Sequence, residues 1–285
     1  MNLALGTVQL GMNYGIRGLA QPGVSQALNI LNSAYSEGIH VFDTASAYGT
    51  AEDVLYQFLR QPQINKERVC IISKFSSSVD NLEVGIKTSL ARLGLDCFGG
   101  YLFHDANLLF DSRAVKALNG LKEKGLTKRI GVSIYTPTQA MKALEYDIID
   151  IIQVPYNVFD RRLDICRFFK KAKDKGVEVH ARSVLLQGLL VMEPETLPKH
   201  MKFAKPYLRK YREICDENNF NPFDMAVLYV LQHTDIDYIV FGVDNIDHLK
   251  EYINLYSKKS EIDIKSFFKN TFDIVENKLI MPNLW

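Results

Sequence analysis

Four side chains that can move or stabilise a proton stand at the carboxyl ends of successive apolar segments. Asp43 ends the second segment and Tyr48 follows it closely, while Lys74 ends the third segment and His104 the fourth. In a barrel of parallel strands, side chains just past the strand ends meet at one rim, where the active site lies. The sequence therefore predicts a site that combines a carboxylate, a phenol, an ammonium and an imidazole.

These groups together could deliver a proton to a carbonyl oxygen. A tyrosine hydroxyl with its usual pKa of about 10 is a weak proton donor at neutral pH, and the ammonium of Lys74 beside it would lower that pKa. Asp43 would compensate the lysine charge inside an apolar barrel, and His104 could orient the carbonyl. Each residue alone also fits a structural role, such as a core histidine at 104. The combination on consecutive segment ends is what predicts catalysis.

Eight short apolar segments alternate with amphipathic helical patterns along the 285 residues. Several, such as Ile148–Val154, are almost continuous in Ile and Val, which is typical of parallel strands covered on both faces. No linker interrupts the alternation, so we expect one α/β domain over residues 1–285, a (β/α)8 TIM barrel, with a doubly wound sheet as the rival. The expected strands are Leu3–Thr7, Ile39–Asp43, Val69–Lys74, Gly100–His104, Arg129–Ser133, Ile148–Val154, Val177–Arg182 and Tyr238–Gly242.

The helical patterns have recognisable ends. An apolar stripe over residues 24–35 is followed by Gly38, and one over residues 82–93 is followed by Gly94. Glycine is the usual residue just past a helix, so both helices are expected to end there. Residues 257–285 contain no strand pattern and are expected to form a C-terminal tail that packs on the barrel.

Composition and charge narrow the classes of partner. Lys and Arg number 34 against 33 Asp and Glu, which leaves a net charge of +1 and no broad basic surface for nucleic acid or an anionic membrane. The four cysteines form no CxxC pair, the six histidines are scattered, and no apolar run reaches the length of a membrane span. We expect a cytoplasmic protein without a metal, a nucleic-acid partner or a membrane anchor.

The candidate residues lie in motifs of a known family. The segment FDTASAYG at 42–49, followed by ISK at 72–74 and LFH at 102–104, resembles the catalytic signature of the aldo-keto reductases, in particular short bacterial members. The resemblance implies reduction of an aldehyde or ketone by NADP(H) or NAD(H), or the reverse oxidation. In that interpretation Tyr48 is the general acid, Lys74 and Asp43 tune it, and His104 orients the carbonyl.

The same resemblance implies a set of cofactor contacts. Ser133 and Gln153 would bind the carboxamide, and Arg182 would lie under the nicotinamide in place of a more usual aromatic residue. The other expected contacts are Gly6 and Thr7 at the nicotinamide, Ser183, Leu185, Gln187 and Gly188 over the diphosphate, and Gly242, Val243, Asp244, Asn245, His248 and Glu251 at the adenosine end.

Some positions depart from the family pattern. Ile134 stands where the family usually has asparagine, and Gly242 and His248 stand where many members carry Lys and Arg for the 2′-phosphate. Asp244 adds a carboxylate nearby. Because charge-assisted contacts to a phosphate are lost, we expect NADH and NADPH to bind within about a hundredfold of each other.

Two other functions fit part of the pattern. Lys74 could form the Schiff base of an aldolase or lyase on the same barrel. The chain could also be a non-catalytic regulatory subunit that binds NAD(P)H. The small-molecule substrate is expected to be a polar, sugar-derived carbonyl compound or the corresponding alcohol, in a pocket lined by Tyr14, Tyr156, Phe159 and Trp285.

Overall fold

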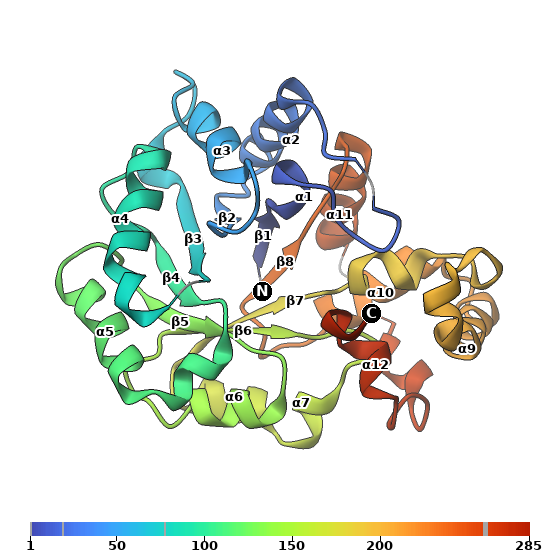
Figure 1. Ribbon diagram of the computed structural model, residues 1–285. Helices are drawn as coiled ribbons and strands as arrows, with labels where there is room; N and C mark the ends of the chain where they lie inside the picture. Colours follow the sequence, from blue (N-terminus) through green and yellow to red (C-terminus); the bar gives the residue numbers. More distant parts are fainter. Residues whose placement is uncertain (1, 19, 77, 259–261) are drawn as a thin grey trace.

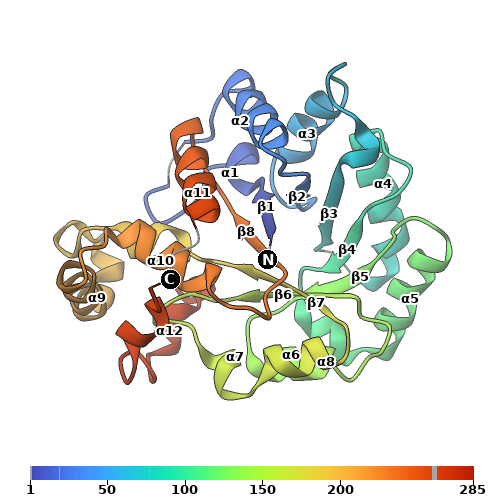
Figure 2. The same ribbon diagram turned by 180° about the vertical axis from the view of Figure 1, so that it is seen from behind.

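Eight parallel strands form a closed barrel in sequence order in the computed structural model, which describes residues 2–18, 20–76, 78–258 and 262–285. Figure 1 shows the helices as a ring around the strands, and Figure 2 shows the same ring from behind. The strands are β1 (Asn2–Gly6), β2 (Val41–Asp43), β3 (Cys70–Phe75), β4 (Gly100–Phe103), β5 (Ile130–Ser133), β6 (Ile151–Pro155), β7 (Glu178–Arg182) and β8 (Tyr238–Phe241). The predicted (β/α)8 fold is confirmed, and each of these strands overlaps a predicted one.

Helices connect the strands on the outside of the barrel. They are α1 (Val8–Gly11), α2 (Val24–Ser36), α3 (Ala51–Leu59), α4 (Leu82–Leu93), α5 (Ser112–Glu123), α6 (Pro137–Ala143), α7 (Arg162–Ile165), α8 (Phe168–Asp174), α9 (Lys205–Glu217), α10 (Pro222–Leu231), α11 (Ile246–Lys258) and α12 (Asn277–Ile280). Gly38 and Gly94, just past α2 and α4, have φ of 84° and 63°. Only glycine adopts this conformation without strain, which explains where both helices end.

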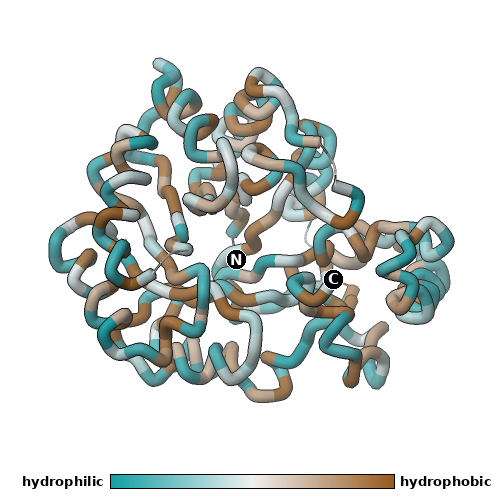
Figure 3. Tube along the Cα trace, viewed as in Figure 1, coloured by the Kyte–Doolittle hydropathy of each residue, from teal (hydrophilic) through white to brown (hydrophobic). Residues whose placement is uncertain are grey.

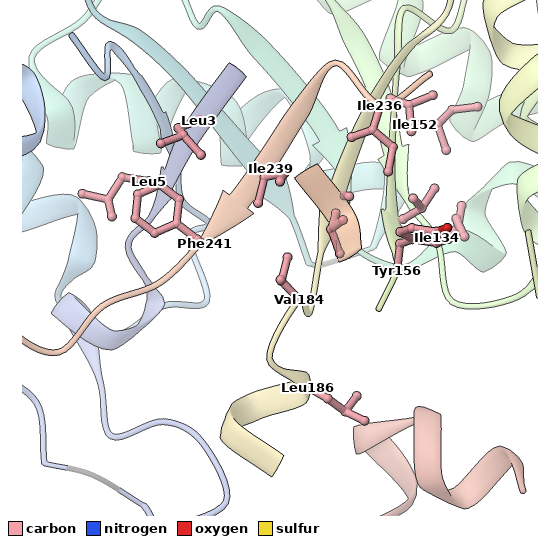
Figure 4. Packing of buried hydrophobic residues seen from close by; sticks show 14 of the residues in the cluster. Leu3, Leu5, Ile134, Ile152, Tyr156, Val184, Leu186, Ile236, Ile239 and Phe241 are labelled. Atoms are coloured by element: carbon pink, nitrogen blue, oxygen red, sulfur yellow. The ribbon is translucent and has the colours of Figure 1, made fainter. Parts of the chain in front are cut away.

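Hydrophobic side chains fill two concentric layers. Ile72, Leu102 and Ile151 pack inside the barrel, and a larger cluster lies between the strands and the helices. Figure 3 shows hydrophobic and hydrophilic residues alternating along the outer helices, as one-sided burial requires. Figure 4 shows part of the larger cluster, to which Tyr156 and Ile134 both belong.

The C-terminal segment packs beside α9 and α10. Phe268 is completely buried, and its ring lies 6.0 Å from that of Tyr211 and 5.6 Å from that of Tyr229. Arg161 donates hydrogen bonds to the carbonyl oxygens of Phe268 and Thr271. Residues 259–261 of the expected tail lie outside the described part. Within the described part, no helix is both long and apolar enough to cross a membrane.

Candidate active site

A hydrogen-bonded chain of Asp43, Lys74 and Tyr48 lies at the carboxyl ends of β2 and β3. Lys74 Nζ donates to Asp43 Oδ1 at 2.5 Å and to the Tyr48 hydroxyl at 3.4 Å. Its third proton goes to the carbonyl oxygen of Thr44, at 3.2 Å. All three ammonium protons therefore have acceptors, as a cation with only 1% of its surface exposed requires.

The protonation of this chain follows from burial and charge. Burial would lower the pKa of Lys74, but the neighbouring Asp43 and Tyr48 outweigh it, so the pKa of the ammonium is raised. Burial raises the pKa of the Tyr48 hydroxyl, and the charge of Lys74 offsets only part of that rise. The expected net lowering of the Tyr48 pKa is thus wrong for the free protein, because desolvation of the phenolate exceeds the attraction of the ammonium. Tyr48 therefore keeps its proton at neutral pH.

His104 completes the group from the end of β4. Its ring lies edge-on to that of Tyr48, with 5.8 Å between centroids, and its Nδ1 lies 2.8 Å from Ser76 Oγ. Burial, with the cations Lys74 and Arg182, lowers the pKa of His104 to about 4. The imidazole is therefore neutral near pH 7 and can hydrogen-bond a carbonyl oxygen without adding a charge.

A cavity of about 550 Å³ opens over this group and runs to the start of α11. A volume of this size suits a small-molecule or cofactor site. Of the predicted residues, it is lined by Gly6, Thr7, Asp43, Tyr48, His104, Ser133, Gln153, Arg182, Ser183, Leu185, Gln187, Gly188, Gly242, Asp244, His248 and Glu251.

Polar groups of β5, β6 and β7 are linked at the inner end of the cavity. Gln153 donates to Asp43 Oδ2 at 2.8 Å and accepts from Ser133 Oγ at 3.3 Å. Arg182 donates from Nε to the same Ser133 oxygen at 3.2 Å, and its guanidinium lies 4.3 Å from the centre of the Tyr135 ring. These contacts hold the carboxamide candidates Ser133 and Gln153 in one network with Asp43 and, through it, with Lys74 and Tyr48.

The outer end of the cavity carries carboxylates. Gln9 Nε2 donates to Asp244 Oδ1 at 3.1 Å, and a side chain at Gly242 would overlap the Gln9 amide. His248 lies 3.8 Å from the other oxygen of Asp244, and Glu251 lines the same end. The lining there contains no lysine or arginine from the described part of β8 or α11.

Three predicted site residues do not line the cavity. Lys74 is hydrogen-bonded to the lining residues Asp43 and Tyr48 but does not line the cavity itself. Val243 is buried in the core, and Asn245 accepts a hydrogen bond from the backbone N–H of His248 at 2.9 Å, as a residue capping α11 would.

The substrate-pocket residues are also only partly as expected. Tyr14 lines the cavity, and burial raises the pKa of its hydroxyl to about 12. Tyr156 and Phe159 are instead core residues, with at most 1% of their surface exposed. Trp285 donates from its indole to the Lys278 carbonyl oxygen and does not reach the cavity. Tyr156 and Phe159 follow β6, but their rings are buried in the core cluster, where large aromatic side chains contribute most to packing.

Several lining residues had not been singled out. Gln9 and Tyr135 follow the ends of β1 and β5, so the strand-end rule that found Asp43 could also have found them. Phe223 and Tyr252 come from α10 and α11, where no sequence signal separates a cavity residue from a core residue. No cluster of three or more His, Cys, Asp or Glu side chains within the described ranges could hold a metal ion.

The cavity has the features that a nicotinamide dinucleotide needs. Hydroxyl and amide groups of Ser133 and Gln153 lie beside the proton-donor group, as a carboxamide would require. A Cβ atom at Gly6 would lie 3.3 Å from the Phe241 carbonyl oxygen, so glycine keeps the end of β1 free of side-chain atoms. The start of α11 can offer free backbone N–H groups to polar ligand atoms.

Comparison with known proteins agrees with these features. The model of the "Aldo/keto reductase family" matches residues 2–268. The chain is 24% identical over 265 residues to the NADH-specific methylglyoxal reductase of Escherichia coli, covering 79% of this chain and 81% of the relative. It is 22% identical over 295 residues to the aldo-keto reductase YhdN of Bacillus subtilis, covering 90% and 88%.

Solved structures show the same architecture. The holo form of aldo-keto reductase AKR11C1 from Bacillus halodurans superimposes with a TM-score of 0.78 over 100% of this chain and 95% of that one, at 20% identity. The barrel, the matched family model and the strand-end residues are thus consistent with one another. This chain belongs to the aldo-keto reductase family.

Proposed function

We propose that this protein reduces an aldehyde or ketone with NADH or NADPH, or catalyses the reverse oxidation, and that Tyr48 is its general acid. The observation that carries the proposal is the Asp43–Lys74–Tyr48 chain, which reaches the cavity beside the neutral His104. A bound dihydronicotinamide would supply the hydride to the carbonyl carbon.

Each residue then has a defined task. His104 and Tyr48 hydrogen-bond the carbonyl oxygen and hold the carbon in place for the hydride. As negative charge develops on that oxygen, the Tyr48 hydroxyl passes its proton to it. The ammonium of Lys74, 3.4 Å from that hydroxyl, stabilises the phenolate that remains. Asp43 keeps Lys74 charged in a buried position.

Substitution of the general acid tests this proposal. We expect Tyr48→Phe to lower kcat by about 100- to 10,000-fold, because the proton donor is lost, while the Kd for NADH stays within about threefold, since the ring is kept. The assay follows nicotinamide absorbance with a panel of aldehydes, keto sugars and sugar alcohols. Tyr146→Phe, which removes a hydroxyl bonded to Leu109 outside the cavity, serves as the control. A Tyr48→Phe enzyme with more than about a tenth of the wild-type kcat would remove Tyr48 from this role.

The aldolase alternative gains no support from the site. A Schiff base requires a neutral amine, whereas Lys74 is paired with Asp43 at 2.5 Å and its pKa is raised. Borohydride treatment with substrate is therefore expected to leave no adduct on Lys74, as judged by mass spectrometry. A stable adduct mapped to that residue would favour the aldolase. A regulatory subunit without turnover would show NADH binding but no activity on any substrate of the panel.

The outer end of the cavity leads us to propose that NADH binds at least as tightly as NADPH. Asp244 is held by Gln9, and Glu251 lies nearby, so a 2′-phosphate would meet two carboxylates. This is consistent with the binding of both cofactors within about a hundredfold. The relative from Escherichia coli is named as NADH-specific, which agrees with this direction.

Removal of one carboxylate tests the preference. We expect Asp244→Asn to tighten NADPH binding about three- to tenfold, because a like charge is removed, and to leave the Kd for NADH within about twofold. Asp247→Asn is the matched control, since this exposed carboxylate stands three residues further along the chain, in the first turn of α11, but does not line the cavity. Calorimetric titration of the wild type and both variants with NADH and with NADPH measures these affinities. A wild-type Kd for NADPH that is lower than the Kd for NADH would contradict the proposal.

We propose that the substrate is a small polar carbonyl compound. Within this class, we propose a sugar-derived aldehyde or ketone. Tyr14 and Tyr135 line the cavity, and each carries a hydroxyl group that a polar substrate can hydrogen-bond. The relative from Escherichia coli acts, by its name, on methylglyoxal, which is also small and polar.

A further inference from the structure

Arg182 brings a second cation to the inner end of the cavity. It ends β7 and lines the cavity together with Tyr48 and His104. Its charge offsets part of the rise in the pKa values of Tyr48 and Tyr14 and adds to the fall in the pKa of His104. Its hydrogen bond to Ser133, which Gln153 links to Asp43, also places the guanidinium beside the group that would bind the carbonyl compound.

The guanidinium is held firmly in place. Its nitrogen atoms donate to Ser133 Oγ at 3.2 Å, to Ser183 Oγ at 3.1 Å and to the Ile134 carbonyl oxygen at 2.9 Å. One of its faces lies against the Tyr135 ring, 4.3 Å from the centroid. Four contacts from two strands and their loops leave this side chain little freedom to swing away from a ligand.

It forms no ion pair with a carboxylate within the described ranges. All of its partners are neutral, namely two hydroxyl groups, one carbonyl and one ring. The carboxylate at this end, Asp43, is occupied by Lys74 and by Gln153. The charge of Lys74 is thus balanced, whereas that of Arg182 is not.

We propose that Arg182 makes the site select the oxidation state of the cofactor, binding the neutral reduced nicotinamide in preference to the cationic oxidised ring. The inference rests on the proposed function. Hydride transfer needs the ring within about 3–3.5 Å of the carbonyl carbon, so the ring lies at the same end of the cavity as Arg182. Transfer moves two electrons and one hydrogen from the ring to the carbonyl carbon, and the ring becomes positively charged while the oxygen takes the proton of Tyr48.

The fixed cation therefore opposes the product form of the cofactor. The neutral ring of the reduced cofactor is not repelled by the guanidinium. The cationic ring of the oxidised cofactor is repelled, because no ion pair neutralises Arg182. Release of the oxidised cofactor is favoured, and inhibition by it is weakened. Arg182 thus suits an enzyme that works in the direction of carbonyl reduction.

Binary binding measures this effect without turnover. Calorimetric titration gives the Kd for NADH and for NAD⁺, and the quantity compared is the ratio of the second to the first. We expect Arg182→Met to lower that ratio at least about tenfold, because a cation near the ring is lost. Arg182→Lys, which keeps the charge, should hold the ratio within about threefold of the wild type.

A second arginine provides the matched control. Arg17 lines the same cavity from the loop after α1 and makes no ion pair with a described carboxylate. Arg17→Met removes the same charge from a loop residue and not from a strand end, so it should weaken both forms alike and leave the ratio unchanged. Thermal melting of each variant confirms that it is folded.

The outcomes separate the inference from the proposed function. An Arg182→Met ratio equal to that of the wild type would overturn the inference, and so would an equal fall of the ratio in Arg17→Met. A rise in the KM for the carbonyl compound with the ratio unchanged would assign Arg182 to the substrate instead. Failure of the wild type to bind either NADH or NADPH would refute the proposed function itself.

Discussion

At the scale of single residues, His104 links the chemistry of the site to the stability of the protein. Its pKa is about 4 in the folded protein and 6.5 when unperturbed, chiefly because it is buried. Between these values the unfolded chain binds a proton and the folded chain does not. The contribution of His104 is therefore fully present above pH 6.5 and is lost as the pH falls towards 4.

This difference predicts how stability depends on pH. From pH 7 to pH 5, the free energy of unfolding of the wild type should fall by about 2 kcal/mol more than that of His104→Gln, which has no imidazole to protonate. Urea unfolding at the two pH values measures both falls. His200→Gln, at an exposed histidine, should behave like the wild type. Equal falls in the wild type and His104→Gln would show that burial does not hold the imidazole neutral.

At the scale of elements, Tyr48 is positioned by close backbone contact between α1 and the turn before α3. The carbonyl oxygen of Gly11 accepts from the backbone N–H of Thr50 at 2.9 Å. Gly49 has φ of 54°, and a Cβ there would lie 2.2 Å from that same carbonyl oxygen. The turn that carries Tyr48 therefore needs glycine for two reasons, conformation and space.

Two alanine variants separate these reasons. Gly38→Ala introduces only a strained φ, since nothing lies within 4 Å of the added Cβ, and should lower the free energy of unfolding by about 1 kcal/mol. Gly49→Ala adds the backbone clash, so we expect a loss larger by at least about 2 kcal/mol. It should also lower kcat, because Tyr48 shifts. Urea unfolding and the reductase assay provide both readouts. Similar losses in the two variants would mean that α1 moves aside easily.

At the scale of the whole molecule, the C-terminal segment stabilises the barrel from outside and contributes no described residue to the cavity lining. Phe268→Ala should lower the free energy of unfolding by about 3–5 kcal/mol, since a buried ring is removed. The Kd for NADH should stay within about twofold. Ile274→Ala is the control, because that side chain is 94% exposed. A large change in NADH affinity in folded Phe268→Ala would connect the segment to the site.

The sequence by itself determined the barrel and placed Asp43, Lys74 and His104 at one rim of it. Alternating apolar and amphipathic patterns are local, and parallel strands bring their carboxyl ends to one rim whatever the loops do. Asp43, Lys74 and His104 could therefore be assigned to the rim from their places at segment ends. The ends of α2 and α4 could also be predicted from a short stretch of sequence, because Gly38 and Gly94 tolerate positive φ.

Only the tertiary structure decided the environment of those residues. The raised pKa of Tyr48 depends on how completely the folded chain excludes water from its hydroxyl. The bond from Gln9 to Asp244 joins residues 235 positions apart. Arg182, on β7, reaches Ser133 of β5 because both strands pair with β6 in the closed barrel. It also donates to Ser183, the next residue, whose φ is 61°. Such contacts depend on loop conformation and on burial, which are properties of the packed chain and not of any short stretch of residues.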